Sequence, residues 1–175
     1  MKIVYSVLCL SLLFLGCQPE PDHDAAIETF EINSQTVLDN VEDFQNENRD
    51  YSQYAEGFVM RSTEFGTRDT LWLEDMMKSD KELWAKYDFK LAADSIYLLP
   101  GVNEDTRMLD GSVRHYTDWR VTRSATDSTE EKSAVIKLYE SFDFNAEGEI
   151  IFQQVYGDFT GLFTYLNSEG EAEEE

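Results

Sequence analysis

The chain is poor in cysteine, histidine, proline and positive charge. Its 175 residues include two cysteines, two histidines and three prolines, and 14 Lys and Arg face 36 Asp and Glu, for a formal net charge of −22. Nucleic-acid phosphates need a basic stripe, so this balance predicts that nucleic acid is not a partner. It also disfavours docking of the protein surface on anionic lipid headgroups.

The chain also lacks an apolar run long enough to cross a bilayer. The longest such run, residues 3–16, follows Lys2 and contains Tyr5 and two serines. A membrane-spanning helix needs about 20 apolar residues, so we interpret residues 1–16 as a signal peptide.

The end of this run, Leu-Phe-Leu-Gly-Cys at 13–17, resembles the lipobox of bacterial lipoproteins. The resemblance implies cleavage before Cys17, lipidation of its sulfur and acylation of the new terminus. Each buried methylene contributes about 0.8 kcal/mol, so several acyl chains would anchor the protein firmly in the membrane. We therefore expect a lipid anchor in the bacterial cell envelope, in its outer membrane, with residues 17–25 as an acidic tether. The alternative is a signal peptide with an incidental cysteine.

The few cysteines and histidines exclude several classes of chemistry. Cys9 lies in the predicted signal peptide and Cys17 would carry lipid, so the mature chain has no disulfide, thiolate nucleophile or cysteine metal site. His23 lies in the tether, and the scattered acids lack the spacing of metal ligands. The chain has no glycine-rich phosphate loop and no nucleophile elbow. We expect no metal and no cofactor.

Two stretches have the three-and-four spacing of amphipathic helices. In residues 25–45 the apolar stripe is Ile27, Phe30, Val37, Leu38, Val41 and Phe44, with Asp24 placed to cap the helix. In residues 71–87 the stripe is Leu71, Met76, Leu83, Trp84 and Tyr87. Between them we expect a helical turn with Tyr51, Tyr54 and Ala55 inward, then a short strand over 58–65.

After Tyr87 the hydrophobic period changes to two, which is typical of strands. We expect strands over 89–97, ending at Pro100-Gly101, and over 112–123, 134–144 and 149–159. Helices followed by consecutive strands predict an α+β domain over residues 26–166, with helices on one face of a curved antiparallel sheet. The acidic end, 167–175, is too polar to pack and is predicted to be a disordered tail.

Several signatures together resemble the SnoaL-like branch of the nuclear transport factor 2-like superfamily. They are the first helix, RDYSQYAEGF at 49–58, RHYTDWRVT at 114–122 and FDFNAEGEIIFQQVYGD at 142–158. The resemblance covers roughly residues 25–165. It implies a cone-shaped α+β barrel with a pocket between the helices and the concave face of the sheet, and frequent homodimers through the other face.

The turn after Phe142 also matches the first half of a calcium-binding EF-hand loop. Asp143, Asn145, Glu147 and Gly148 fit, but the twelfth position is Gln154 rather than the bidentate Glu that calcium requires. Both flanks alternate like strands, so we predict a β-hairpin in which Gly148 is left-handed.

Side chains alternate along a strand, and this places His115 on an apolar face. Val113, His115, Thr117, Trp119 and Val121 share that face. On the next strand Glu140 is the only charged residue in the set Ala134, Ile136, Leu138, Glu140, Phe142 and Phe144. In the last strand the parity is ambiguous. A carboxylate in an apolar cavity has a raised pKa, and a nearby histidine can share its proton.

His115 and Glu140 are therefore candidate catalytic residues, with His115 as an ordinary hydrogen-bonded core residue as the alternative. Family enzymes such as ketosteroid isomerase place Asp or His in this cavity beside aromatic hydroxyls, which Tyr54 and Tyr97 could supply. The predicted pocket lining is Tyr54, Trp84, Tyr97, His115, Trp119, Glu140 and Gln153.

Three functions fit this pattern. The first is binding of a small apolar ligand or a partner protein without catalysis. The second is an isomerase, dehydratase or cyclase that acts on an enolisable ketone or polycyclic substrate through His115 and Glu140. The third is a purely structural dimer that uses the outer face of the sheet.

Overall fold

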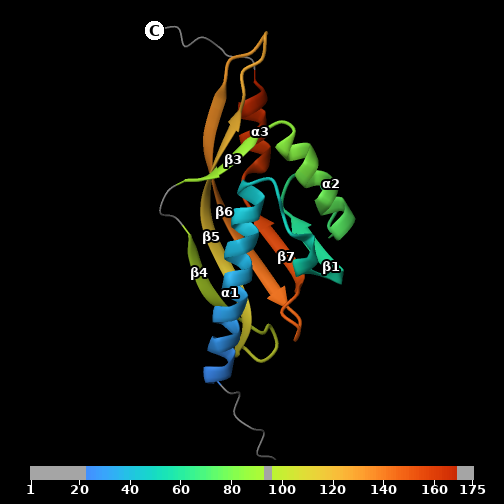
Figure 1. Cartoon of the computed structure of the whole chain (residues 1–175), viewed down its shortest axis with the longest axis vertical. Helices are drawn as coiled ribbons and strands as arrows, with labels where there is room; N and C mark the ends of the chain where they lie inside the picture. Colours follow the sequence, from blue (N-terminus) through green and yellow to red (C-terminus); the bar gives the residue numbers. More distant parts are fainter. Residues whose placement is uncertain (1–22, 93–95, 169–175) are drawn as a thin grey trace, which may run out of the picture.

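A computed structural model describes residues 23–92 and 96–168. The predicted signal peptide, Cys17 and residues 169–175 of the tail lie outside the described residues. Along the chain (Figure 1) the elements are α1 (His23–Gln45), a 3₁₀ turn η1 (Tyr51–Gln53), β1 (Tyr54–Ser62), β2 (Leu71–Trp72), α2 (Leu73–Trp84), β3 (Asp88–Leu91), β4 (Tyr97–Val102), β5 (Leu109–Arg123), β6 (Lys132–Phe144), β7 (Ile150–Tyr156) and α3 (Phe159–Asn167). The α+β class is confirmed.

The strands form one seven-stranded sheet in the order β2-β1-β7-β6-β5-β3, with β4 paired to β5. Every pairing is antiparallel except that of β1 with β7, which is parallel. The predicted curved antiparallel sheet is confirmed apart from this one parallel pair. Parallel neighbours need a long crossover connection, and here most of the domain separates β1 from β7 in sequence.

The strand predicted over 89–97 is divided into two. β3 and β4 pair with different parts of β5, so that Leu91 faces Trp119 and Tyr97 faces Tyr116. Pro100 does not end the strand but lies within β4. Proline lacks a backbone N–H, and β4 can hold it because β4 has a partner strand on one side only.

Helix α1 covers one face of the sheet along β5. Its buried apolar residues Phe30, Val37 and Val41 belong to the predicted stripe. The helix includes His23 and Asp24, inside the range predicted as tether, so Asp24 lies within the helix instead of capping it. Close packing on β5 depends on Gly111, whose φ is +78° and whose carbonyl oxygen accepts a hydrogen bond from Asn33 Nδ2 at 2.9 Å.

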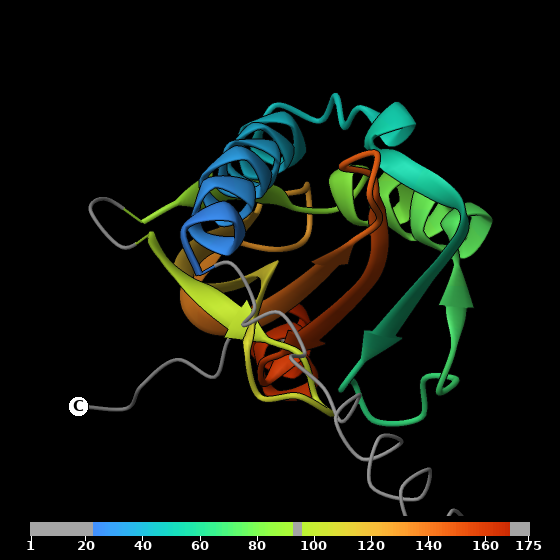
Figure 2. The same cartoon turned by 90° about the horizontal axis from the view of Figure 1, so that it is seen from below.

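Helix α2 is shorter than the predicted stripe. Leu71 lies in β2, and the helix begins at Leu73, where the Asp75 carboxylate accepts the Trp72 backbone N–H at 3.0 Å. Met76 is buried and turns toward the sheet. In Figure 2 the two helices lie on the same side of the curved sheet.

The C-terminal helix α3 was not predicted, and Asn167, assigned to the tail, is its last residue. The Asp158 side chain caps its start by accepting the Gly161 N–H at 2.8 Å. Leu162 and Leu166, one helical turn apart, are buried. The helix contacts β6 and β5 near the top of Figure 1 and so closes one end of the concave face.

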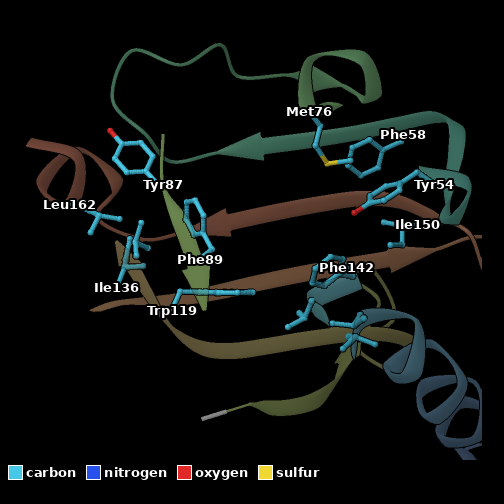
Figure 3. Close-up of a cluster of buried hydrophobic side chains, with 14 of the residues drawn as sticks. Tyr54, Phe58, Met76, Tyr87, Phe89, Trp119, Ile136, Phe142, Ile150 and Leu162 are labelled. Atoms are coloured by element: carbon cyan, nitrogen blue, oxygen red, sulfur yellow. The ribbon is translucent and has the colours of Figure 1, made fainter. Parts of the chain in front are cut away.

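The faces predicted for the two long strands are confirmed. Every residue of the set Val113, His115, Thr117, Trp119 and Val121 is buried. In β7, Gln153 and Val155 lie inside and Ile151 outside, and a register irregularity opposite Asp143 and Phe144 turns Ile150 inward as well. The labelled core side chains in Figure 3 form two groups, Tyr54, Phe58, Met76, Phe142 and Ile150 at one end and Tyr87, Phe89, Trp119, Ile136 and Leu162 at the other.

The segment that resembles an EF-hand loop is a hairpin turn, as predicted. The Asn145 N–H donates to Glu149 O at 3.0 Å, and Gly148 has φ +81°. Asp143 pairs with Arg114 at 3.1 Å instead of pointing into a loop. Across residues 23–92 and 96–168 no group of three or more His, Cys, Asp or Glu side chains is placed to hold a metal ion.

Candidate functional site

A cavity of about 390 Å³ opens between the helices and the concave face of the sheet. Both groups of core residues in Figure 3 contribute to its wall. The apolar lining residues are Val41, Phe44, Met60, Leu71, Met76, Leu83, Phe89, Trp119, Ile136, Leu138, Phe142, Val155, Phe159 and Phe163. Ligand sites in proteins are typically concave and apolar with a few placed polar groups.

One such polar group is the Glu140 carboxylate. Glu140 faces His115 in the pairing of β6 with β5, and His115 Nδ1 lies 2.9 Å from Glu140 Oε2. From β7, Gln153 Nε2 donates to Glu140 Oε1 at 3.0 Å. An ionised carboxylate only accepts, so Nδ1 carries a proton and donates. Both oxygens of Glu140 are thus held by neighbouring strands.

The direction of the Glu140 pKa differs from the expectation. Burial pushes the pKa of this carboxyl up, but the hydrogen bond and charge of His115, with the Gln153 bond and the Arg49 charge, outweigh burial and lower it. The prediction of a raised pKa is wrong because His115 and Gln153 donate hydrogen bonds to Glu140. The carboxylate is ionised at neutral pH.

A second polar cluster joins the segment after α1 to helix α2. Arg49 Nη1 donates to Asp80 Oδ2 at 2.9 Å, and the Tyr51 hydroxyl donates to the same oxygen at 3.1 Å. The side chains of Arg49 and Asp80 are only 9% and 5% exposed. Burial raises the pKa of Asp80, while Arg49 and the Tyr51 hydroxyl oppose that rise. The Arg49 guanidinium also covers the Phe44 ring, 4.6 Å from its centroid.

The structure brings together three of the seven residues predicted to line the pocket. Trp119, Glu140 and Gln153 line the cavity. His115 is 0% exposed and lies behind Glu140, outside the lining. It touches the cavity only through the carboxylate that it holds, so its role there is to position Glu140.

The other three predicted residues do not line the cavity. The Tyr54 hydroxyl is buried and accepts a hydrogen bond from Asn40 at 2.7 Å. Trp84 packs on Phe44 with ring centroids 5.5 Å apart. Tyr97 is 62% exposed on the outer face. A continuous strand through Leu91 would carry Tyr97 inward opposite Val113, but the division into β3 and β4 shifts the register by an odd number of residues and turns it outward.

Sequence reasoning missed Arg49 and Asp80. Asp80 lies four residues after Met76 and three before Leu83, so the helical stripe itself placed a carboxylate on the buried face. Arg49 lies in a polar segment whose letters carry no such periodicity. Only the tertiary fold brings it over Phe44 and against α2.

Comparisons by sequence give no match: no protein-family model and no curated protein matches this chain. Solved structures do match. A protein named as a polyketide cyclase from Xanthomonas campestris pv. campestris superposes with a TM-score of 0.59 at 13% identity, over 79% of this chain and 98% of that chain. One named as a SnoaL-like polyketide cyclase from Shewanella denitrificans has a TM-score of 0.55 at 11% identity, over 79% and 98%. A pinacolase from Penicillium brevicompactum has a TM-score of 0.55 at 16% identity, over 80% and 93%.

These likenesses show the fold. The chain has the SnoaL-like, nuclear transport factor 2-like architecture that the sequence signatures implied. At such identities the chemistry of the neighbours does not transfer with the fold. No helix in the described part of the chain is long and apolar enough to cross a membrane.

Proposed function

We propose that this protein binds a small, mostly apolar molecule in the cavity between α1, α2 and the sheet, without chemistry of its own. The observation that carries the proposal is the cavity itself. Its volume is about 390 Å³, its walls are mostly apolar, and His115 and Gln153 hold the Glu140 carboxylate in place. A ligand there would bury its body against aromatic and aliphatic side chains, at about 25 cal/mol per Å² of apolar surface.

The state of Glu140 favours binding over proton transfer. A general base works best when its pKa lies near the working pH, whereas the pKa of Glu140 is lowered below its ordinary range. His115, the other titratable candidate, has no contact with the cavity. The pair is therefore better suited to orient a bound group than to abstract a proton.

The test is binding by the full chain, purified gently in detergent. Native mass spectrometry would show a retained small molecule, and the neutral dye N-phenyl-1-naphthylamine would report an accessible apolar cavity by fluorescence. Met60 lines the cavity, so Met60→Trp should fill it and abolish dye binding. Val135 is exposed on the outer face, so Val135→Trp adds the same indole without that effect. Equal dye binding by both variants would refute the proposal.

A second candidate function is acid–base catalysis on an enolisable ketone or polycyclic substrate, as an isomerase, dehydratase or cyclase. The 2.9 Å contact between His115 and Glu140 favours it, because a carboxylate that lines a cavity and touches a histidine can exchange protons. The test is exchange of the α-protons of 2-tetralone in deuterated buffer. Glu140→Gln should abolish any exchange above that of buffer, while Val135→Trp should leave it unchanged.

We also propose that lipid on Cys17 anchors the protein in the cell envelope. The support is the lipobox-like sequence at 13–17, which precedes a folded domain that includes helix α1, His23–Gln45. The protein should fractionate with membranes, and Cys17→Ser should release it to the soluble fraction. A wild-type protein found only in the soluble fraction would contradict the anchor.

A homodimer through the outer face is the remaining proposal. In the strand registers Tyr97, Tyr116, Tyr139 and Tyr156 stand opposite one another across four strands, and the ring centroids of Tyr116 and Tyr139 are 4.9 Å apart. Light scattering at micromolar concentration should give twice the monomer mass, and Tyr139→Asp should reduce it to one. A wild-type monomer would contradict the dimer.

A further inference from the structure

The buried end of the cavity carries no net positive charge. Arg49, Asp80 and Glu140 line it, and His115 lies directly behind Glu140. Arg49 and Asp80 neutralise each other at 2.9 Å. The charge available to a ligand therefore depends on Glu140 and on the state of His115.

The net charge of the groups around Glu140 is either negative or zero. With His115 neutral, the sum over Arg49, Asp80 and Glu140 is −1; with His115 protonated, the sum over the four groups is 0. Each oxygen of Glu140 accepts one hydrogen bond from the protein, and a carboxylate oxygen has two lone pairs. Glu140 can accept a further bond, and it has no proton to offer.

Buried polar atoms without a hydrogen-bond partner do not change this balance, because the charge of the Arg49 guanidinium is already counted in it. In the described part of the chain, the buried atoms without a hydrogen-bond partner include the acceptor Gln153 Oε1 and the donor Arg49 Nε. Gln153 Oε1 would favour a donor on the ligand and Arg49 Nε an acceptor, so these two atoms do not select between them. The net charge of the cavity therefore decides the class of ligand.

The side chains at the mouth of the cavity also carry a net negative charge. Its lining includes the acidic residues Glu64, Asp75 and Glu82 and the basic residues Arg68 and Lys78. Arg68 is already paired with Asp75 at 2.6 Å, and Lys78 lies 3.7 Å from Glu82. An anionic ligand finds no uncompensated cation on its way to Glu140.

We infer that the ligand of this cavity carries a hydrogen-bond donor, an ammonium or a hydroxyl group, that faces Glu140, and that carboxylates are rejected. The inference rests on the proposed binding function. A donor completes the open lone pairs of Glu140, whereas a ligand carboxylate would lose its hydration beside a like charge. The body of the ligand is apolar, as the walls require.

The test compares three ligands with the same bicyclic body: 1-naphthylmethylamine, 1-naphthalenemethanol and 1-naphthoic acid. Each competes with N-phenyl-1-naphthylamine for the wild-type full chain at pH 7. Judged by displacement of the dye, the amine and the alcohol should bind at least about tenfold more tightly than the acid, a difference of about 1.4 kcal/mol in binding free energy. This ranking needs no variant, so it does not depend on whether a mutant folds.

The matched variant is Glu140→Gln, which keeps the size of the side chain and removes its charge. It should weaken the amine and strengthen the acid, so that their affinities come within about threefold of each other. Displacement by the acid as tight as by the amine, or an unchanged ranking in Glu140→Gln, would overturn the inference alone. If the dye and all three ligands fail to bind, the proposed binding function is wrong, and the inference falls with it.

Discussion

Two neighbouring rows of residues cross the same three strands and face opposite environments. The inner row, His115, Glu140 and Val155, is buried beneath the helices. The outer row is one residue away on each strand: Tyr116, Tyr139 and Tyr156. Tyr116 and Tyr156 are exposed, and Tyr139 is half-buried between them.

The difference shows what each side of a sheet demands of a polar group. On the inner side Glu140 is held by His115 and Gln153, because a buried charge needs partners. On the outer side the tyrosine rings pack against one another at a tilt, with the ring centroids of Tyr139 and Tyr156 5.9 Å apart. The same strands carry both rows, and only the inner row lies on the face where helices and sheet enclose the cavity.

The largest effect should come from truncating an inner aromatic ring. Phe142 is almost wholly buried and lines the cavity. Phe142→Ala should lower the free energy of unfolding by about 4 kcal/mol, whereas Tyr156→Ala on the outer face should cost less than about 1 kcal/mol. Urea denaturation measures both. Equal costs would mean that the outer face is covered too.

Breaking the buried ion pair should come next. Arg49→Met leaves Asp80 buried without its cation, and the expected cost is about 3 kcal/mol. The outer-face pair of Lys137 with Asp118 is the comparison, because the Lys137 side chain is 82% exposed. Lys137→Met should cost less than about 1 kcal/mol in the same denaturation experiment. A larger loss for Lys137→Met than for Arg49→Met would contradict this assignment.

Substitution of two glycines with similar backbone angles separates the cost of backbone strain from the cost of a steric clash. Gly111 and Gly148 have φ of +78° and +81°, but a Cβ at Gly111 would lie 2.5 Å from Thr29 Cγ2, and one at Gly148 would meet nothing within 4 Å. Gly148→Ala should cost about 1 kcal/mol for the backbone alone, and Gly111→Ala about 2 kcal/mol. Thermal unfolding checks the order. Equal costs for the two substitutions would contradict this prediction and would mean that α1 moves aside to make room for a Cβ at residue 111.

The smallest effect concerns pH. Because the folded pKa of Glu140 is lowered below its ordinary 4.5, its stabilisation is present above that value and is lost as pH falls through the folded pKa. Glu140→Gln cannot titrate, so its free energy of unfolding should fall less between pH 6 and pH 3 than that of the wild type. A steeper fall in the variant would contradict the lowered pKa.

The sequence predicted those parts of the fold that depend on local periodicity. Alternation along 112–123 and 134–144 placed His115 and Glu140 on one face, and the antiparallel pairing of consecutive strands made their contact possible. Spacing of three and four placed Phe30, Val37 and Val41 on the buried side of α1. These patterns are local because each residue's face follows from its neighbours in the chain.

Tyr97 and Arg49 could not be placed in the same way. The face of Tyr97 depends on a register set by pairing with β5, and an odd shift reverses it. The role of Arg49 depends on Asp80, which lies 31 residues later, on helix α2. Neither contact has a signature within its own segment.

By itself, then, the sequence determined the α+β class, the buried stripe of α1, the inner face of the long strands and the excess of negative charge. Only the tertiary structure decided that β1 joins β7, that Arg49 meets Asp80, and that donors from two strands lower the pKa of Glu140 in the cavity wall. The physical reason is the separation along the chain of the residues that set each feature. Periodicity records which side of an element is buried, whereas the charge and shape of a cavity arise where distant elements meet.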